Sequence, residues 1–144
     1  MNAIVDRQGV VGYVPGAWDM FHIGHLNILK RAREQCDWLV AGVVTDEALF
    51  EMKNKYPIVP FEERLEIVAS IGIVDEAVDD QSSNKLQVWD RVHYDVLFKG
   101  DDWRGTAKGR RLERDLATVG ARVQYFPYTL HTSSTELRRV LSEW

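Results

Sequence analysis

The segment VVGYVPGAWDMFHIGH, residues 10–25, decides the fold class of this 144-residue chain. An apolar run typical of a buried strand ends at Pro15-Gly16, and an amphipathic helical pattern begins a few residues later. Because the first N–H groups of a helix lack internal partners and lie at its positive end, this transition predicts an anion site. His22 and His25 are expected on one face of the first helical turn, where their ring N–H groups can donate to phosphate oxygens.

Strand-like and helical patterns alternate along the rest of the chain. Strands are predicted at residues 10–14, 38–44, 73–78, 94–98 and 121–126. Helices are predicted after each strand, with starts at Thr45, Pro60, Ser82 or Ser83, and Ser133. We therefore predict a single-domain α/β fold, a doubly wound, Rossmann-like, mostly parallel five-stranded sheet with helices on both faces. The domain is expected to span residues 9–144, after an N-terminal tail of residues 1–8.

The composition is that of an ordinary globular protein, with 45% hydrophobic and 28% charged residues. Eighteen basic and 22 acidic residues give a net charge of −4, which argues against a nonspecific nucleic-acid binder. Cys36 is the only cysteine, so the chain contains no internal disulfide and no Cys-based zinc cluster, and we expect a small buried residue there. No signal peptide and no membrane-length apolar run is visible, so we expect a cytoplasmic location and no membrane partner.

Polar segments follow several of the predicted strands. Because ligands of doubly wound sheets bind beyond the carboxyl ends of the strands, these segments are expected to converge. They are the His22/His25 turn and residues 45–55, 99–103 and 128–135. In the third of them Gly100 allows close approach, while carboxylates there suit a base amine, a ribose hydroxyl or Mg²⁺. In the last, Ser133 and Glu136 form a capping box at a helix N-terminus that also suits phosphate.

These motifs together resemble the cytidylyltransferase branch of the nucleotidyltransferase superfamily. Residues 16–25 resemble its G-T-F-D-x-x-H-x-G-H signature, with Ala17 and Trp18 in place of Thr-Phe. Residues 100–103 match the family's Gly-Asp-Asp-Trp, and residues 61–64 resemble a segment that ends in a functional arginine. Residues 128–135 align without a gap on R-T-x-G-I-S-T-T. The resemblance extends over roughly residues 9–141 in family order.

The resemblance implies transfer of CMP from CTP to a small alcohol phosphate, with release of pyrophosphate, Mg²⁺ on the triphosphate and a homodimeric state. Glycerol 3-phosphate is the first candidate acceptor. The implied catalytic residues are His22, His25, Lys53, Lys55 and Arg64. The implied nucleotide-binding residues are Gly16, Ala17, Trp18, Asp19, Gly24, Gly100, Asp101, Asp102, Trp103, Tyr128, Thr129, His131, Ser133, Ser134 and Thr135. No metal site held by the protein alone is predicted.

The chain departs from the family pattern in its last motif. Tyr128 occupies the arginine position and His131 the glycine position, so a cation expected near the triphosphate is missing unless His131 replaces it. The run Ser-Ser-Thr-Glu-Leu-Arg at residues 133–138 also resembles related adenylyltransferases. An adenylyltransferase that uses ATP is therefore the alternative enzyme.

Each residue also has a structural interpretation. The two histidines could pack against Trp18 and Phe21, or bind a metal with Asp19. The lysines could be surface charges, and Arg64 could pair with acids near Pro60 on a helix surface. From another functional class, the chain could be a non-catalytic nucleotide-binding module. A flavodoxin-like signalling domain would need an acidic pocket that the first strand end does not offer.

Overall fold

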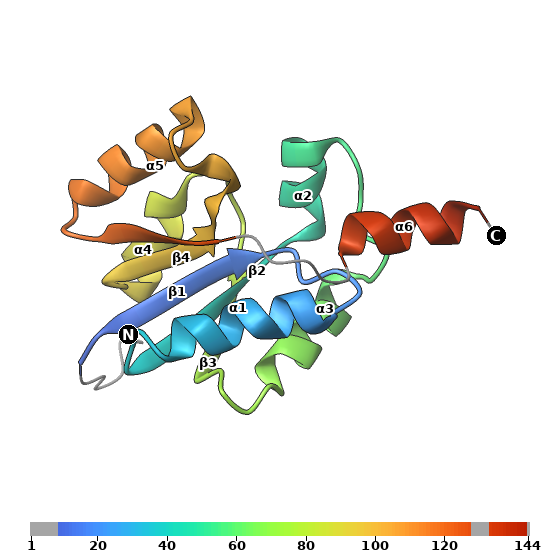
Figure 1. Ribbon diagram of the computed structural model, residues 1–144, viewed down its shortest axis with the longest axis horizontal. Coiled ribbons are helices and arrows are strands. Elements are labelled where there is room, and N and C mark those ends of the chain that lie inside the picture. The colour runs from blue at the N-terminus through green and yellow to red at the C-terminus, as the bar shows by residue number, and fades with distance from the viewer. Residues whose placement is uncertain (1–8, 128–132, 144) are drawn as a thin grey trace.

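Five parallel strands form one sheet in the order β3-β2-β1-β4-β5 in the computed structural model (Figure 1), which describes residues 9–127 and 133–143. The strands are β1 (Val11–Gly16), β2 (Trp38–Val44), β3 (Glu76–Asp80), β4 (Val96–Gly100) and β5 (Arg122–Phe126). The helices are α1 (Ile23–Arg33), α2 (Asp46–Lys53), α3 (Phe61–Ala69), α4 (Lys85–Val92), α5 (Ala107–Ala117) and α6 (Ser134–Ser142), with a 3₁₀ turn η1 (Asp101–Trp103). The predicted doubly wound, Rossmann-like α/β fold is confirmed.

Two apolar clusters hold helices on opposite faces of the sheet. One joins strand residues such as Leu39 and Phe98 to Leu29 of α1 and Val68 of α3. The other joins residues such as Tyr13 and Leu97 to α4 and α5. Figure 1 shows α1 and α3 below the strands and α4 and α5 above them. Strand residues that alternate between two covered faces explain why β1 and β2 are apolar almost throughout.

Helices α2 and α6 lie beyond the carboxyl ends of the strands (Figure 1). α2 is joined to the end of β2 by a small cluster of Val44, Ala48 and Leu49. α6 contains no buried residue. The strand order reverses between β1 and β4, which is where doubly wound sheets open a crevice for ligands. Helices α2 and α6 therefore lie next to the crevice where a ligand is expected.

The strand predicted at 73–78 is wrong in position. β3 is the polar stretch Glu76–Asp80, an edge strand paired only with β2. Val74 is buried in the core from a turn, in which its N–H donates to the carbonyl of Ile71. The apolar residues of this stretch lie in the turn, which packs beneath the sheet and is buried there. The edge strand β3 needs fewer apolar side chains than that turn, so apolar residues do not mark its position.

Smaller boundary differences have local causes. The N-cap of α4 is Asn84, whose side chain accepts from the N–H of Leu86, so the predicted cap at Ser82 or Ser83 is wrong. β1 continues past Val14 to Gly16 because its residues stay paired with β2. The predicted tail of residues 1–8 lies outside the described residues.

Cys36 is half-buried beside β1 and not fully buried as predicted. Burial raises the pKa of its thiol, against the opposing charge of Arg33. Over the described part of the chain, no helix combines the length and the apolar character that a membrane crossing requires.

Candidate functional site

The connection between β1 and α1 is a strained turn. Trp18 and Met20 adopt left-handed backbone conformations, with φ of 58° and 52°, although neither is glycine. Such residues cost about 1–3 kcal/mol each and persist only where the surroundings enforce them. Here the indole N–H of Trp18 donates to the carbonyl of Gly42 at 2.8 Å, and the Trp18 side chain is buried. The contacts that hold Trp18 in this conformation also fix the turn that leads into the two histidines.

His22 and His25 cap α1 with their own rings. His22 Nδ1 accepts from the N–H of Gly24 at 3.1 Å, and His25 Nδ1 accepts from the N–H of His22 at 3.1 Å. The two rings stack with centroids 3.9 Å apart, and the ring of Trp18 packs edge-on against His25. Because each Nδ1 is an acceptor, each neutral ring carries its proton on Nε2. The turn therefore presents imidazole donors without requiring a fixed charge.

Ser134, the first residue of α6, joins the histidine turn to the C-terminal helix. Its hydroxyl donates to the carbonyl oxygen of Asp19 at 2.7 Å. His22 Nε2 lies 3.2 Å from the same Oγ, which fits an Nε2–H that donates to it. The Ser133 hydroxyl accepts from the N–H of Glu136, which is one of the two bonds of the predicted capping box; the return bond from the Glu136 side chain is not formed among the described residues. Two helix N-termini, those of α1 and α6, thus meet at the same point.

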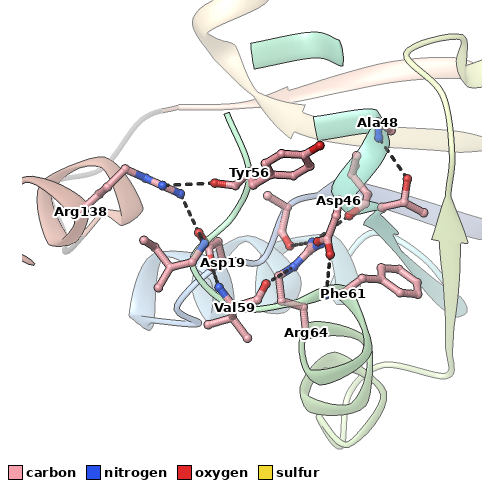
Figure 2. A network of polar contacts seen from close by, with 12 residues as sticks. Asp19, Asp46, Ala48, Tyr56, Val59, Phe61, Arg64 and Arg138 are labelled. Atoms are coloured by element: carbon pink, nitrogen blue, oxygen red, sulfur yellow. Dashed lines mark hydrogen bonds and ion pairs between the residues drawn. The ribbon is translucent and has the colours of Figure 1, made fainter. Parts of the chain in front are cut away.

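Asp19 is buried and its carboxylate is directed at protein donors (Figure 2). It accepts from the N–H groups of Ile58 and Val59 at 2.8 Å each, and from the guanidinium of Arg138 at 2.7 Å. Arg138 also reaches the carbonyl of Tyr56 at 3.4 Å. One carboxylate therefore ties together the histidine turn, the loop after α2 and helix α6. This geometry gives Asp19 a positioning role for the site.

Arg64 lies beneath the site with no exposed surface (Figure 2). Its guanidinium donates to the carbonyls of Ala17, Val44 and Val59 at 2.7–2.8 Å and pairs with Asp46 at 2.6 Å. An ion pair on a helix surface with acids near Pro60 is therefore the wrong interpretation. A phosphate contact would require the side chain to leave these acceptors, so the structure places Arg64 as a support of the loops around the site.

Two adjoining pockets open at the carboxyl edge of the sheet. The first, about 300 Å³, lies between the β1 end, α2 and α6, and we call it the lysine pocket. The second, about 380 Å³, lies between α1, the ends of β4 and β5, and α6, and we call it the strand-end pocket. Both are lined by His25, Ile28, Ser134 and Thr135. Their shared wall is therefore the junction of the two helix N-termini.

The structure brings most of the predicted site residues to these pockets. The lysine pocket is lined by Gly16, Ala17, Trp18, Asp19, His25, Lys53, Lys55, Ser134 and Thr135. The strand-end pocket is lined by His22, Gly24, His25, Gly100, Ser133, Ser134 and Thr135. Predicted residues Tyr128, Thr129 and His131 lie outside the described residues. Lys53 and Lys55 are both exposed at the mouth of the lysine pocket, as residues that meet a mobile ligand would be.

The Gly-Asp-Asp-Trp segment forms the end of β4 and the single turn η1. Gly100 lines the strand-end pocket, while Asp101, Asp102 and Trp103 follow it outward. The ring of Trp103 packs with the α4–α5 cluster, and Lys99 Nζ lies 4.1 Å from its centroid. In this geometry Trp103 serves as a packed support for the strand end.

Three polar residues of the pockets were missed from the sequence. Asn27 and Arg31 of α1 line the strand-end pocket, and Arg138 lines the lysine pocket. Arg31 also donates to the carbonyl of Pro127 at 3.3 Å, next to the segment where the sequence lacks an expected cation. The signal for Arg31 was its spacing, since it lies two helical turns after Gly24 on the same face. Arg138 belongs to the Ser-Ser-Thr-Glu-Leu-Arg run at residues 133–138, from which its contact with Asp19 cannot be predicted.

Within the described residues, no group of three or more His, Cys, Asp or Glu side chains is arranged to hold a metal ion. The suggested site of His22, His25 and Asp19 is not formed, because the Asp19 carboxylate binds backbone N–H groups and Arg138. The pair of histidines instead uses Nδ1 for capping.

Residues 13–140 match the sequence profile of the family described as cytidylyltransferase-like. The chain belongs to the cytidylyltransferase-like family. This confirms the resemblance to the nucleotidyltransferase superfamily that the histidine turn first indicated. The match spans both pockets and every described residue that lines them.

Among related proteins, a glycerol-3-phosphate cytidylyltransferase of Bacillus spizizenii is 30% identical over 86% of this chain and 91% of its own length. An FAD synthase of Thermococcus kodakarensis is 29% identical over 94% of this chain and 91% of its own. An ethanolamine-phosphate cytidylyltransferase of Arabidopsis thaliana is 36% identical over 67% of this chain, which spans only 24% of that protein. A lipopolysaccharide core biosynthesis protein of Thermoplasma volcanium shares the fold, with a TM-score of 0.72 over 87% of this chain and all of that one at 22% identity.

Proposed function

We propose that this protein transfers CMP from CTP to a small alcohol phosphate and releases pyrophosphate. The observation that carries the proposal is the wall of His25, Ser134 and Thr135 shared by two pockets. A group-transfer enzyme needs two substrate sites that meet at the donors which stabilise the transferred group. The family membership supports nucleotide chemistry at this point.

The nucleotide fits the strand-end pocket. The Gly100 backbone allows close approach, and the N-terminus of α6 with Ser133 and Thr135 offers donors to phosphates. Arg31 supplies a cation in this pocket. We assign Arg31 to the triphosphate, in the role that Tyr128 cannot fill.

The acceptor fits the lysine pocket, where Lys53 and Lys55 supply positive charge at its mouth. An oxygen of the acceptor phosphate attacks the α-phosphorus of CTP, a new P–O bond forms, and the bond to the bridging oxygen of the leaving pyrophosphate breaks. The acceptor is already ionised at neutral pH, so no general base is required. Catalysis is then positioning and stabilisation of developing negative charge by the Nε2–H groups of His22 and His25, with His22 exchanging its contact to Ser134 Oγ for a phosphate oxygen.

Mg²⁺ enters this proposal with the nucleotide and neutralises charge on its phosphates. The described residues offer no metal site of their own, so the ion depends on the triphosphate. Glycerol 3-phosphate is the first acceptor to test, since a relative that matches over nearly its whole length is named for that substrate. An adenylyltransferase that uses ATP is the second candidate, and the FAD synthase relative favours testing it.

Pyrophosphate release from purified protein tests the proposal. CTP and ATP are each offered with Mg²⁺ and a panel of glycerol 3-phosphate, ethanolamine phosphate and other phosphoalcohols. We expect release with CTP and at least one acceptor, and none when the acceptor is omitted. Pyrophosphate release with ATP and an acceptor, but not with CTP and an acceptor, would make ATP the nucleotide substrate in place of CTP. The absence of release with every pair would contradict the proposed enzymatic activity. Binding of a nucleotide without turnover would then identify the protein as a nucleotide-binding module.

A further inference from the structure

Lys99 is a half-buried lysine on β4 that begins the predicted segment 99–103 but has no assigned role and lines neither pocket. Leu97 of β4 pairs with Tyr13 of β1, so Lys99 lies level with Pro15, two residues further along both parallel strands. Pro15 lines the lysine pocket. Because side chains alternate along a strand, Lys99 shares with Leu97 the face that α4 and α5 cover. Lys99 therefore lies on the strand next to Pro15, beside that pocket.

The ammonium of Lys99 lacks the partner that a buried charge normally has. Its Nζ lies over the ring of Trp103, 4.1 Å from the centroid. In the described part of the chain, no hydrogen bond or ion pair joins this ammonium to an acceptor. Burial lowers the pKa of Lys99; Asp102 opposes this shift, and the nearby charges of Lys85 and Lys53 add to it. A cation in such surroundings is destabilised until an anion approaches it.

Three lysines from three elements converge at this edge. Lys99 comes from β4, Lys53 from the last turn of α2, and Lys85 from the first turn of α4. Asp80 offsets the charge of Lys85 at 2.8 Å. Among the described residues, Lys53 and Lys99 form no ion pair, and the charge of Asp102 offsets only part of the effect of burial and of the two neighbouring lysines on the pKa of Lys99. Like charges gathered with too few counter-charges favour the binding of an anion between them.

We propose that Lys99 and Lys53 together bind the phosphate group of the acceptor, Lys53 from the mouth of the lysine pocket and Lys99 from the neighbouring strand β4. The inference rests on the proposed function and names the acceptor as a small phosphomonoester in its dianionic form. Lysine suits this task as a compact charge on a flexible stem, which can follow the phosphate as it moves toward the α-phosphorus. Lys99 is then an acceptor-binding residue and not a nucleotide ligand.

Steady-state kinetics separates the two substrates. Lys99→Met keeps the volume of the side chain and removes its charge. We expect it to raise the KM for glycerol 3-phosphate, or for whichever acceptor the screen identifies, by about 10-fold or more, since a hydrogen bond to a charged group is lost. The KM for the nucleotide should stay the same. Lys108→Met is the matched control, because Lys108 Nζ also lies over Trp103, at 5.7 Å, but on the exposed surface, and it should change neither KM.

The pH profile distinguishes a charge from a packing role. Lys99 faces Asp102, Lys85, Lys53 and, across the Trp103 ring, Lys108. In the wild-type protein the KM for the acceptor should rise as the pH passes through the lowered pKa of Lys99, because the amine then loses its charge. Lys99→Arg stays charged throughout, so it should restore binding at pH 7 and lose that rise. An equal increase in both KM values for Lys99→Met, or an unchanged acceptor KM, would overturn the proposal.

Ligand-induced stabilisation tests the site without turnover. Inorganic phosphate should raise the thermal midpoint of the wild-type and Lys108→Met proteins relative to chloride at equal ionic strength, and raise that of Lys99→Met much less. If no substrate pair reacts, the proposed function fails while this measurement still decides the anion site. No shift in the wild type, or the same shift in Lys99→Met, would overturn the inference.

Discussion

In each of the two histidines, His22 and His25, the two ring nitrogens have different roles. Nδ1 of each ring is used by the backbone of α1, and Nε2 carries the proton that serves as a donor. A serine or asparagine cap would satisfy the helix equally well but would present no second donor at that distance. The requirement for both nitrogens explains why this helix begins with two histidines, an unusual residue type for a cap.

A pair of substitutions at His22 separates these roles. The side-chain oxygen of His22→Asn can accept from the Gly24 N–H as Nδ1 does, whereas His22→Ala removes cap and donor together. We expect both variants to lower kcat by about 100-fold, because the donor aimed at developing charge is lost. The free energy of unfolding in urea should fall by about 1 kcal/mol in His22→Ala and stay nearly unchanged in His22→Asn. Near-normal turnover in both folded variants would contradict the catalytic role of this histidine.

At the scale of elements, Arg64 is what holds α3 against the strand ends. Its guanidinium satisfies carbonyls at the ends of β1 and β2 and in the loop before α3, and it pairs with Asp46 of α2. A buried carbonyl without a donor costs free energy, so the positions of these segments around the crevice depend on the hydrogen bonds of Arg64. Arg64 thereby supports, from below, the histidine turn and helix α2 with the loop after it, which carry Lys53 and Lys55.

Arg64→Lys should lower the free energy of unfolding by about 2–4 kcal/mol, because an ammonium cannot reach the same divergent acceptors as the planar fork. Glu62→Gln, exposed on the same helix, is the control and should change it by less than about 0.5 kcal/mol. Urea denaturation measures both. A loss as small as that of the control would contradict the bonding described here.

At the scale of the whole molecule, alternation of apolar strands with helical patterns was sufficient to predict the sheet. Residues 38–44 were predicted as a strand with the bounds that the structure shows, because a central parallel strand is apolar on both faces. β3 was misplaced because its own residues are mostly polar, whereas the apolar Val74 before it is buried from a turn. Apolar periodicity reports burial, and in this stretch the buried residues are not the residues of the strand.

The candidate site was predicted less evenly. Motif residues such as His25 and Ser134 meet at the pockets because topology alone brings strand ends together. The buried position of Arg64 could not be predicted, since its partners are backbone carbonyls from three separated segments and leave no trace in residue type. Lys99 belongs to the predicted segment 99–103, but its grouping with Lys53 and Lys85 was not predicted, because sequence spacing does not show that these lysines lie near it.

Helix α6 is attached to the rest of the protein by polar contacts and can therefore open. The helix buries none of its residues, and Ser134 and Arg138 hold it to the body through Asp19 and the Tyr56 carbonyl. Breaking a few such bonds exposes no core, so the helix can swing away at a small fraction of the global unfolding cost. Native-state hydrogen exchange should show α6 amides opening far more readily than those of β1, and bound nucleotide should slow them. Equal protection of the two would contradict this. In the proposed reaction α6 contacts both substrates, so its opening is the route that we expect for product release, and the rate of that opening is then expected to limit turnover.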